Sequence, residues 1–310
     1  MGITMKGQRI KRTLLGFTGK DGIAYLFMSG YLLLFITFII LPVLAGVGMS
    51  LTYFNTIQPP QFVGVKNFVD LFTRDRVFMQ NVIPNTLQFA LFVGLGGYII
   101  SFMLAWMLAQ LTRGPRTILA IILYSPSLTG GVVMSVIWRT LFSGDEFGYM
   151  NQLLLSLGFI DAPIQFLQSP DYLMAVMIIV SIWSSMGIGF LAMLAGILNV
   201  NSELYEAAAI DGIRNRYQEI IYITVPSMKP QMLFGAVMAV VGTFNASNIG
   251  AQLSGQNPTP QNAGQLVVTH LEDYGFLRLE MGYAAAISVT LLIFVYYVSR
   301  IAFKAFGERD

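Results

Sequence analysis

The sequence predicts an all-α polytopic membrane protein with six transmembrane helices, on three observations. First, 55% of the 310 residues are hydrophobic and only 11% are charged, whereas a soluble domain carries about 25% charged residues. Second, the apolar residues gather in six long runs, each sufficient for the roughly 20 residues that cross a hydrocarbon core of ~30 Å. Third, Lys and Arg concentrate on alternate connections between these runs, which is typical of multi-pass membrane proteins.

The six predicted helices follow directly from the apolar runs. A proline within a membrane helix is tolerated but breaks the regular backbone bonding, so we expect a kink at Pro42 in the first helix. Pro126 and the pair Gly130-Gly131 are expected to interrupt the third. The predicted helices span, in chain order, residues 23–51, 85–111, 117–138, 173–198, 231–249 and 281–303.

The distribution of basic residues predicts the orientation of this six-helix domain, residues 23–303. If the N-terminal tail, residues 1–22, is cytoplasmic, 13 of the 18 Lys and Arg residues fall on the cytoplasmic side. Basic residues are enriched in cytoplasmic connections, so the C-terminal tail, residues 304–310, is also predicted to be cytoplasmic. The basic residues left outside are Lys66, Arg74, Arg76, Arg139 and Arg278.

A polar stretch between the fourth and fifth predicted helices, residues 202–230, is predicted to form two short amphipathic helices at the cytoplasmic membrane surface. Ser202 is expected to cap the first helix, which Gly212 ends because glycine tolerates a left-handed backbone. Pro226 is expected to end the second helix. The apolar face predicted for the second helix consists of Ile213, Tyr217, Ile220 and Ile221. Such a shape can insert into a groove on a soluble partner.

This stretch resembles the EAA loop of the membrane subunits of binding-protein-dependent ABC importers. Glu206-Ala207-Ala208, Asp211-Gly212 and Ile223-Thr224-Val225-Pro226 match the family pattern, with Val225 in place of the usual leucine. Ten residues separate Gly212 from Ile223, one more than the pattern has. One extra residue would rotate the second helix by roughly 100° unless a bulge absorbs it. The resemblance implies that residues 202–228, the coupling loop, contact an ATPase subunit. The residues implied in that contact are Glu203, Glu206, Ala207, Ala208, Asp211, Gly212, Ile223 and Pro226.

The resemblance extends along most of the chain, to the carbohydrate branch of these permeases and to the first of its two paired membrane subunits. The resemblance rests on short segments that occur in the same order as in the family. The external loop 250–263 departs from the Gly-Gly-Pro that is usual there. These segments are Phe62-Val63-Gly64, Asn67-Phe68, Asn85-Thr86, residues 135–138, Leu141-Phe142, residues 148–151, residues 204–208 and residues 282–284.

The resemblance implies a type I ABC importer permease fold in the bacterial or archaeal cytoplasmic (inner) membrane. It also implies a second, homologous permease subunit in a heterodimer, two ATPase subunits and an extracytoplasmic solute-binding protein. No cofactor is expected on this chain, because ATP and Mg²⁺ would bind the partner ATPase.

The residues themselves give little support to an enzyme. The segment Gly16–Asp21 has a Gly-Lys pair but lacks the spacing and the following Ser or Thr of a phosphate-binding loop. The chain has no cysteine, so Cys-ligated metal and thiolate chemistry are excluded, and no metal site or catalytic residue is predicted. The single histidine, His270, is expected to be a solvated external residue. The net charge of +2 gives no case for nucleic acid.

Neutral polar and aromatic side chains within the predicted helices are candidates for a sugar-binding cavity. A sugar has hydroxyl groups that form hydrogen bonds and an apolar face that stacks on an aromatic ring. The alternative is helix packing, since Ser, Thr and Gly often mediate contacts between membrane helices. The candidates are Ser127, Trp183, Ser184, Thr243, Asn245 and Asn248.

The sequence therefore predicts the permease subunit of an ATP-driven importer, for an oligosaccharide or related sugar, that works by alternating access. One alternative is the same kind of importer for another solute, such as a polyamine or glycerol phosphate. An ATP-independent carrier or channel is a second alternative, although proton-coupled carriers usually keep charged residues within the membrane. An intramembrane enzyme is a third.

Overall fold

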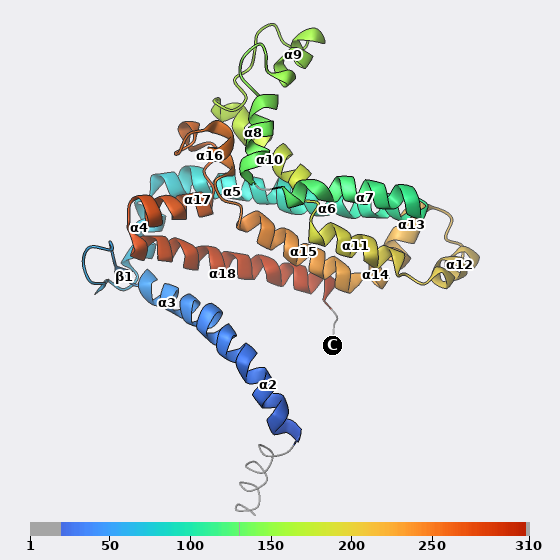
Figure 1. The fold of residues 1–310 in the computed structure, drawn as a ribbon, viewed down its shortest axis with the longest axis horizontal. Coiled ribbons are helices and arrows are strands. Elements are labelled where there is room, and N and C mark those ends of the chain that lie inside the picture. Colours follow the sequence, from blue (N-terminus) through green and yellow to red (C-terminus); the bar gives the residue numbers. More distant parts are fainter. Residues whose placement is uncertain (1–19, 130, 308–310) are drawn as a thin grey trace, which may run out of the picture.

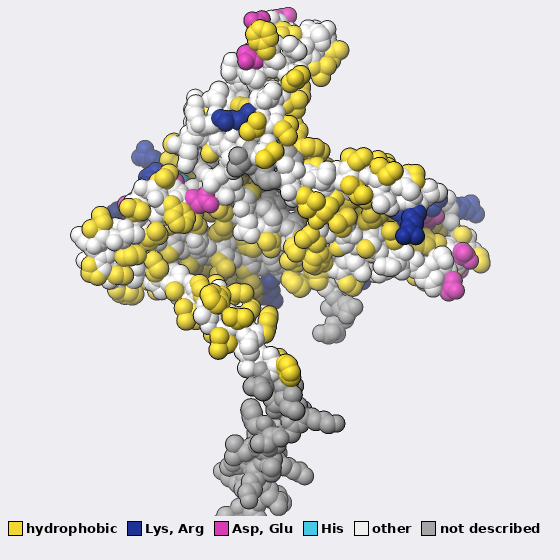
Figure 2. Space-filling model, viewed as in Figure 1, with side chains coloured by type: hydrophobic (Ala, Val, Ile, Leu, Met, Phe, Trp, Pro, Cys, Tyr) yellow, Lys and Arg dark blue, Asp and Glu magenta, His cyan; other side chains and the backbone are white. Residues whose placement is uncertain are grey.

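The computed structural model describes residues 20–129 and 131–307, and these form an almost entirely helical molecule (Figure 1). The described strands are β1 (Thr52–Tyr53) and β2 (Gln61–Phe62), which pair antiparallel with Thr52 opposite Phe62. Figure 2 shows hydrophobic side chains spread over much of this face, while the charged side chains lie mainly toward the ends of the molecule, among them the end that carries α12 (Ser202–Ile210). This apolar surface fits a protein that is surrounded by lipid.

The N-terminal arm extends away from the other helices (Figure 1). It consists of α2 (Lys20–Phe35), a π-helical turn η1 (Ile36–Ile40) and α3 (Leu41–Ser50), and α3 packs against α18 (Met281–Phe306). Pro42 lies in the first turn of α3, directly after the π turn, where a missing backbone N–H is tolerated. Ser50 at the end of α3 is buried, but the most apolar 18-residue stretch of the span Phe27–Ser50 contains no buried residue.

The second predicted helix begins earlier than the sequence suggests, at Phe78 instead of Asn85. It runs through η2 (Phe78–Val82), α5 (Ile83–Phe89), η3 (Ala90–Gly96) and α6 (Gly97–Ala109). The carboxylate of Asp75 accepts the backbone N–H of Phe78 at 2.9 Å, which satisfies a donor at the start of the helix. Pro84 lies in the first turn of α5, after a π turn, and so does not end the helix.

Three of the predicted helices are broken. The third consists of α7 (Arg113–Leu128) and α8 (Gly131–Leu141), as Pro126 and the glycine pair lead one to expect. The fourth consists of α10 (Pro170–Ser184) and α11 (Ile188–Leu198), which meet at a bend of 46°. The fifth consists of α15 (Lys229–Phe244) and the short α16 (Ile249–Ser254). Between α8 and α10, the external segment forms α9 (Tyr149–Ser156), which stands away from the bundle (Figure 1).

Among the described residues, three helices are long and apolar enough to cross a membrane, or four if the bent pair α10–α11 is one span. The three are Phe27–Ser50, Phe78–Ala109 and Met281–Phe306. The third and fifth predicted helices fall short because their breaks leave pieces of at most 16 residues. The count of six spans and the cytoplasmic position of both termini therefore stay predictions, and residues 1–19 and 308–310 of the tails lie outside the described residues.

The two ends of the helix bundle differ in their elements (Figure 1). One end carries β1, α4 (Lys66–Thr73), α17 (Val267–Glu272) and the π turn η6 (Asp273–Leu277). The opposite end carries α12 and α13 (Arg216–Glu219). Between the ends, α6, α11 and α15 pack around buried side chains such as Phe190, Met193 and Met228. The 3₁₀ turn η5 (Pro260–Asn262) leads into α17.

Candidate functional site

The first half of the coupling loop is the helix α12. Its N-cap is Asn201 and not Ser202, because the Asn201 side chain accepts the N–H of Glu203 at 3.1 Å. The prediction of Ser202 as the cap was wrong by one residue: either side chain can cap, but the backbone of Asn201 has the extended conformation of a cap and Ser202 is already helical. Glu203 lies in the first turn, where a carboxylate interacts favourably with the helix dipole.

Gly212 ends α12 in the way that the sequence predicts. Its φ is +97°, a conformation that non-glycine residues rarely adopt. The N–H of Ile213 bonds to the carbonyl of Ala208 at 3.0 Å, and the N–H of Gly212 to that of Ala209 at 3.4 Å. These two bonds form a Schellman motif, which satisfies the last carbonyl groups of the helix and turns the chain.

The second half of the loop contains a π-helical turn. It begins with α13, continues through η4 (Ile220–Thr224) and ends with α14 (Val225–Ser227). The N–H of Val225 bonds to the carbonyl of Ile220, and a bond over five residues accommodates one residue more than an α-helical bond. The turn therefore absorbs the extra residue in the sequence pattern. Pro226 lies in α14, and the segment ends one residue after it, at Ser227, so the predicted end is displaced by one residue.

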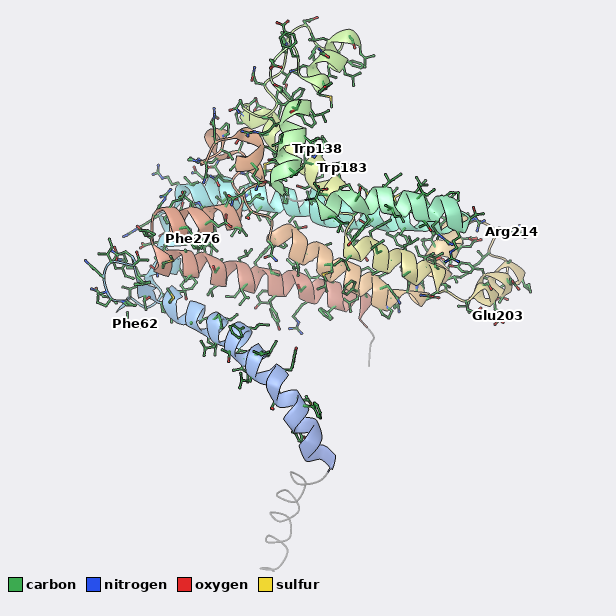
Figure 3. All side chains as sticks on the ribbon, viewed as in Figure 1. Phe62, Trp138, Trp183, Glu203, Arg214 and Phe276 are labelled. Atoms are coloured by element: carbon green, nitrogen blue, oxygen red, sulfur yellow. The ribbon has the colours of Figure 1, made fainter. Side chains whose placement is uncertain are left out.

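The coupling loop exposes several large apolar side chains. The exposed fractions are 87% for Ile210, 76% for Tyr217 and 68% for Tyr222. The expected single apolar face is not formed, because Tyr217 is exposed while Ile213 and Ile220 are half-buried. Figure 3 shows Glu203 and Arg214 at this end of the molecule. Of the residues implied in ATPase contact, Ala208 and Ile223 are buried, and the others are exposed: Glu203, Glu206, Ala207, Asp211, Gly212 and Pro226.

A cavity of about 690 Å³ lies where the broken helices meet. The end of α7, the bend between α10 and α11, and the last turns of α15 all line it. Each helix end leaves backbone N–H or C=O groups without a partner in its own helix. Broken helices near the membrane midplane commonly form the substrate sites of transporters.

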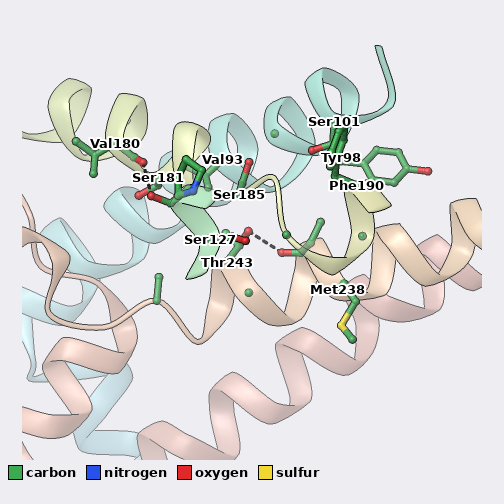
Figure 4. Close-up of a pocket in the computed structure, with 18 of the residues that line it drawn as sticks. Val93, Tyr98, Ser101, Ser127, Val180, Ser181, Ser185, Phe190, Met238 and Thr243 are labelled. Carbon is green, nitrogen blue, oxygen red and sulfur yellow. Dashed lines mark hydrogen bonds between the residues drawn. The ribbon is translucent and has the colours of Figure 1, made fainter. Parts of the chain in front are cut away.

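Hydroxyl groups supply much of the polar lining of this cavity. Figure 4 shows Ser127, Ser185 and Thr243 around it. The hydroxyl groups of Ser127, Ser184 and Thr243 donate to carbonyl groups of their own helices, at 2.7, 3.0 and 2.7 Å. Their oxygen atoms remain free to accept further hydrogen bonds. None of the described residues that line the cavity is charged.

The structure thus brings together three of the six predicted substrate residues, and the other three lie outside the cavity lining. Trp183 packs edge-on against Trp138, with ring centroids 5.2 Å apart, and is 41% exposed. Asn245 is the exposed C-cap of α15. Asn248 has a left-handed backbone, and its side chain donates to the carboxylate of Glu272.

Several cavity residues were not singled out from the sequence. Tyr98, Ser181 and Ser247 also line the cavity, as do the backbone atoms of Gly187. The signal for Gly187 was present, because Ser184-Ser185-Met186-Gly187 interrupts an apolar run with small and polar residues. The positions of the other three depend on which face of each helix turns inward, and the uniformly apolar surroundings do not reveal that face.

A second polar centre lies at the opposite end of the bundle from the coupling loop. His270 is 5% exposed, and its Nε2 donates to the Asp75 carboxylate at 2.9 Å. The hydroxyl of Tyr283 donates to the same carboxylate oxygen at 2.9 Å. The prediction of a solvated His270 was wrong, because α17, which carries it, packs against η2 at the start of the second helix and this packing buries the ring. We call Asp75, His270 and Tyr283 the Asp75 cluster.

The carboxylate of Asp75 is held in its charged form. Burial by itself raises the pKa of this group, but hydrogen bonds from His270 and the Phe78 N–H, with the charge of His270, outweigh burial. The net result lowers the pKa of Asp75 from 3.8 to about 2. The charged groups that line the pocket beside the cluster are Lys66, Asp70, Arg74, Arg278 and Glu280.

No protein-family model matches the chain, but curated relatives do. It is 33% identical to the arabinooligosaccharides transport system permease protein AraP of Bacillus subtilis over 294 residues, or 94% of this chain and 91% of the relative. It is 26% identical to the lactose transport system permease protein LacF of Rhizobium radiobacter, with 92% and 94% covered.

A solved structure has the same fold. It is a bacterial ABC transporter involved in the import of the acidic polysaccharide alginate, with a TM-score of 0.76 and 23% identity, over 94% of this chain and 99% of that chain. A related structure contains the alginate transporter in complex with an alginate pentasaccharide-bound periplasmic protein, with a TM-score of 0.75. The extent and identity of the match to AraP show that the chain belongs to the family of permease subunits of sugar ABC transporters.

Proposed function

We propose that this chain is a membrane-spanning subunit of an ATP-driven, binding-protein-dependent importer of a neutral oligosaccharide. The observation that carries this proposal is the uncharged, hydroxyl-lined cavity at the breaks of α7, α10–α11 and α15. Membership of the sugar permease family supports it. Curated relatives are named for arabino-oligosaccharides and lactose.

The lining of the cavity supports a neutral substrate. Transfer of a carboxylate from water into a site without a compensating charge is costly, and none of the described lining residues supplies a cation. The chain shares its fold with an importer of an acidic polysaccharide, but the fold alone does not determine the substrate. Hydroxyl oxygens that accept and helix-end N–H groups that donate complement the hydroxyl groups of a sugar.

The exposed coupling loop supports the proposal of an ATPase contact at the cytoplasmic end. ATP and Mg²⁺ would bind two partner ATPase subunits, and closure of those subunits would push residues 202–226. The helices would then rock between inward-open and outward-open states around the cavity. A homologous permease subunit would complete the path, and an extracytoplasmic binding protein would deliver the sugar. Purified alone, this chain is expected to hydrolyse no ATP.

The test is Thr243→Val, which removes one cavity hydroxyl while nearly keeping the side-chain volume. Thr290→Val is a matched control, because Thr290 also donates to its own helix, at 2.8 Å to Ala286, but does not line the cavity. We expect Thr243→Val to reduce oligosaccharide uptake about fivefold, the effect of one hydrogen bond, at an unchanged amount of assembled complex. Thr290→Val should leave uptake unchanged.

The uptake assay uses cells with the complete transporter and a panel of arabino-oligosaccharides, malto-oligosaccharides, lactose and an alginate oligosaccharide. Uptake of the alginate oligosaccharide alone would contradict the neutral-substrate proposal. Normal uptake by Thr243→Val would contradict the assignment of the cavity. Uptake that continues without the ATPase subunits would favour an ATP-independent carrier.

Roles for Trp183, Asn245 and Asn248 in substrate contact stay predictions. A sugar would meet these residues only on a path that extends beyond the cavity toward α8 and α16. Trp183→Phe and Asn245→Ala in the same assay test this extension, since each should weaken uptake without reducing the amount of complex.

A further inference from the structure

We propose that Tyr205 and Thr224 are positioning residues, whose hydrogen bond makes the two halves of the coupling loop move as one body. An ATPase that pushes α12 would then move α15 together with α11. This inference rests on the proposed docking of the coupling loop on an ATPase.

The bond joins residues that are 19 positions apart in the sequence. The Tyr205 hydroxyl in α12 lies 3.0 Å from Oγ1 of Thr224 in the π turn η4. Thr224 is 1% exposed, and its hydroxyl also donates to the carbonyl of Glu219 at 3.3 Å. Because a carbonyl only accepts and a threonine hydroxyl has one hydrogen, Tyr205 donates to Thr224. The burial of Thr224 shields this bond from competition with water.

The first half of the loop has few other attachments. Ala208 is the buried residue of α12, and the others are half-buried or exposed. The chain can pivot before this helix, where α11 ends at Leu198, and after it at Gly212. The backbone N–H of Arg214 donates to the Gln218 side chain at 3.0 Å, but both residues belong to the second half of the loop, so this hydrogen bond does not hold α12. The Tyr205–Thr224 bond therefore restrains α12 against the second half.

The second half is anchored in the helix bundle. Four residues after Thr224, Met228 is fully buried in the core formed by α6, α11 and α15. The π turn holds the backbone around Thr224 in place, since the N–H of Val225 bonds back to the carbonyl of Ile220. A displacement of α12 that is passed to Thr224 is thus passed to the start of α15.

Both helices that would receive this displacement form walls of the cavity. Gly189 of α11 faces Gly235 of α15 so closely that a Cβ on Gly189 would lie 3.3 Å from the Gly235 Cα. Gly189 and Gly235 both line the cavity. Close-packed helices shift as units more readily than they deform. The bond therefore lies between the docking surface and the two cavity walls that must move together.

The experiment measures sugar transported per ATP hydrolysed by the complete transporter in proteoliposomes, with the oligosaccharide identified by the uptake panel. The variants are Tyr205→Phe and Thr224→Val, each of which removes one partner, and Thr224→Ser, which keeps the hydroxyl. Tyr222→Phe is a matched control, because Tyr222 lies on the same loop but is 68% exposed.

We expect Tyr205→Phe and Thr224→Val to lower this ratio about fivefold, the effect of one hydrogen bond, while ATP hydrolysis continues. The double variant should be no worse than either single variant, since both remove the same bond. Thr224→Ser and Tyr222→Phe should keep the wild-type ratio. A role limited to stabilising the loop would reduce the amount of complex without changing the ratio.

A wild-type ratio in Tyr205→Phe would overturn the proposal, as would additive losses in the double variant. Because the same assembled complexes transport the sugar and hydrolyse the ATP, poor assembly of a variant lowers both amounts and does not obscure their ratio. The docking role itself is tested separately by substitution of Gly212. Normal transport with a charged residue at position 212 would contradict the docking proposal. If Gly212→Asp lowers transport but Tyr205→Phe keeps the wild-type ratio, only the proposed positioning role is contradicted.

Discussion

The coupling loop and the Asp75 cluster occupy opposite ends of the helix bundle and are built in opposite ways. The loop exposes its helices, its charges and several large apolar side chains. The cluster buries an aspartate and a histidine, whose side chains are 6% and 5% exposed. Exposed apolar groups favour contact with a partner, whereas a satisfied buried network rigidifies its surroundings. One end is suited to receive a moving subunit, and the other to hold helices together.

This difference predicts that substitutions at the two ends fail in different ways. A change in the coupling loop should reduce transport without reducing the amount of folded protein. A change in the Asp75 cluster should reduce stability, while each assembled complex still transports.

The largest expected effect is at Gly212, which we propose enters a cleft on the ATPase. Its φ of +97° is strained for any other residue, although a Cβ there would meet no atom within 4 Å. Gly212→Asp should therefore fold with only local strain of about 1–3 kcal/mol. We expect sugar uptake to fall roughly tenfold or more, because strain and a buried charge both oppose docking.

The control for this prediction is Gly114→Asp in the first turn of α7. Gly114 also has open space around it but no positive φ, and an acidic residue suits the first turn of a helix. This variant should keep normal uptake. Normal uptake by Gly212→Asp, with the complex intact, would contradict the docking role of the coupling loop and with it the proposed difference between the two ends.

The end of the first coupling-loop helix was predictable from the sequence because its signals are local, whereas the expected apolar face of the second half was not formed. Gly212, the acidic first turn and the charged surroundings all act over a few residues. The sequence did not predict the π turn at Ile220–Thr224 itself. It indicated only that some bulge was needed if the extra residue was not to rotate the second helix. The cap was misplaced by one residue because Asn201 and Ser202 are both suitable N-cap types.

The Asp75 cluster was not predictable, because its members come together only through tertiary folding. Asp75 and His270 lie 195 positions apart, and an isolated histidine in a loop carries no pattern. The cavity is an intermediate case. Pro126 and the glycine pair indicated one helix break, but the side chains that face inward depend on the packing of nearly uniform apolar helices.

The next largest effect is expected for Asp75→Asn, which removes the buried charge. His270 and Tyr283 donate to one oxygen of Asp75, and the Phe78 N–H donates to the other. Asparagine has only one acceptor oxygen, so the donors on one side would face its NH₂ group. Loss of a buried partner costs about 1–3 kcal/mol, so the melting temperature of the purified chain should fall. Uptake per assembled complex should stay normal. A loss of uptake at full stability would place the cluster in transport instead.

The stability of the wild type should also depend on pH through Asp75. Its pKa is lowered from 3.8 to about 2 in the folded protein, so its contribution is fully present above its ordinary pKa. The contribution is lost as the pH falls through the folded value, and amounts to about 2 kcal/mol. Between about pH 4 and pH 2, the melting temperature of the wild type should fall more steeply than that of Asp75→Asn. Parallel curves would contradict this assignment.

The smallest effect is expected for His270→Gln, because a glutamine amide can still donate to the Asp75 carboxylate. The variant loses the ring contacts with Phe78 and Tyr274, whose centroids lie 5.8 and 4.9 Å from the imidazole. Such contacts are worth about 0.5–1.5 kcal/mol, so the melting temperature should fall less than in Asp75→Asn. In the double variant, the second change should add little, since both act on one bond. If His270→Gln proved as destabilising as Asp75→Asn, the imidazole ring and not the carboxylate would be the centre of the cluster.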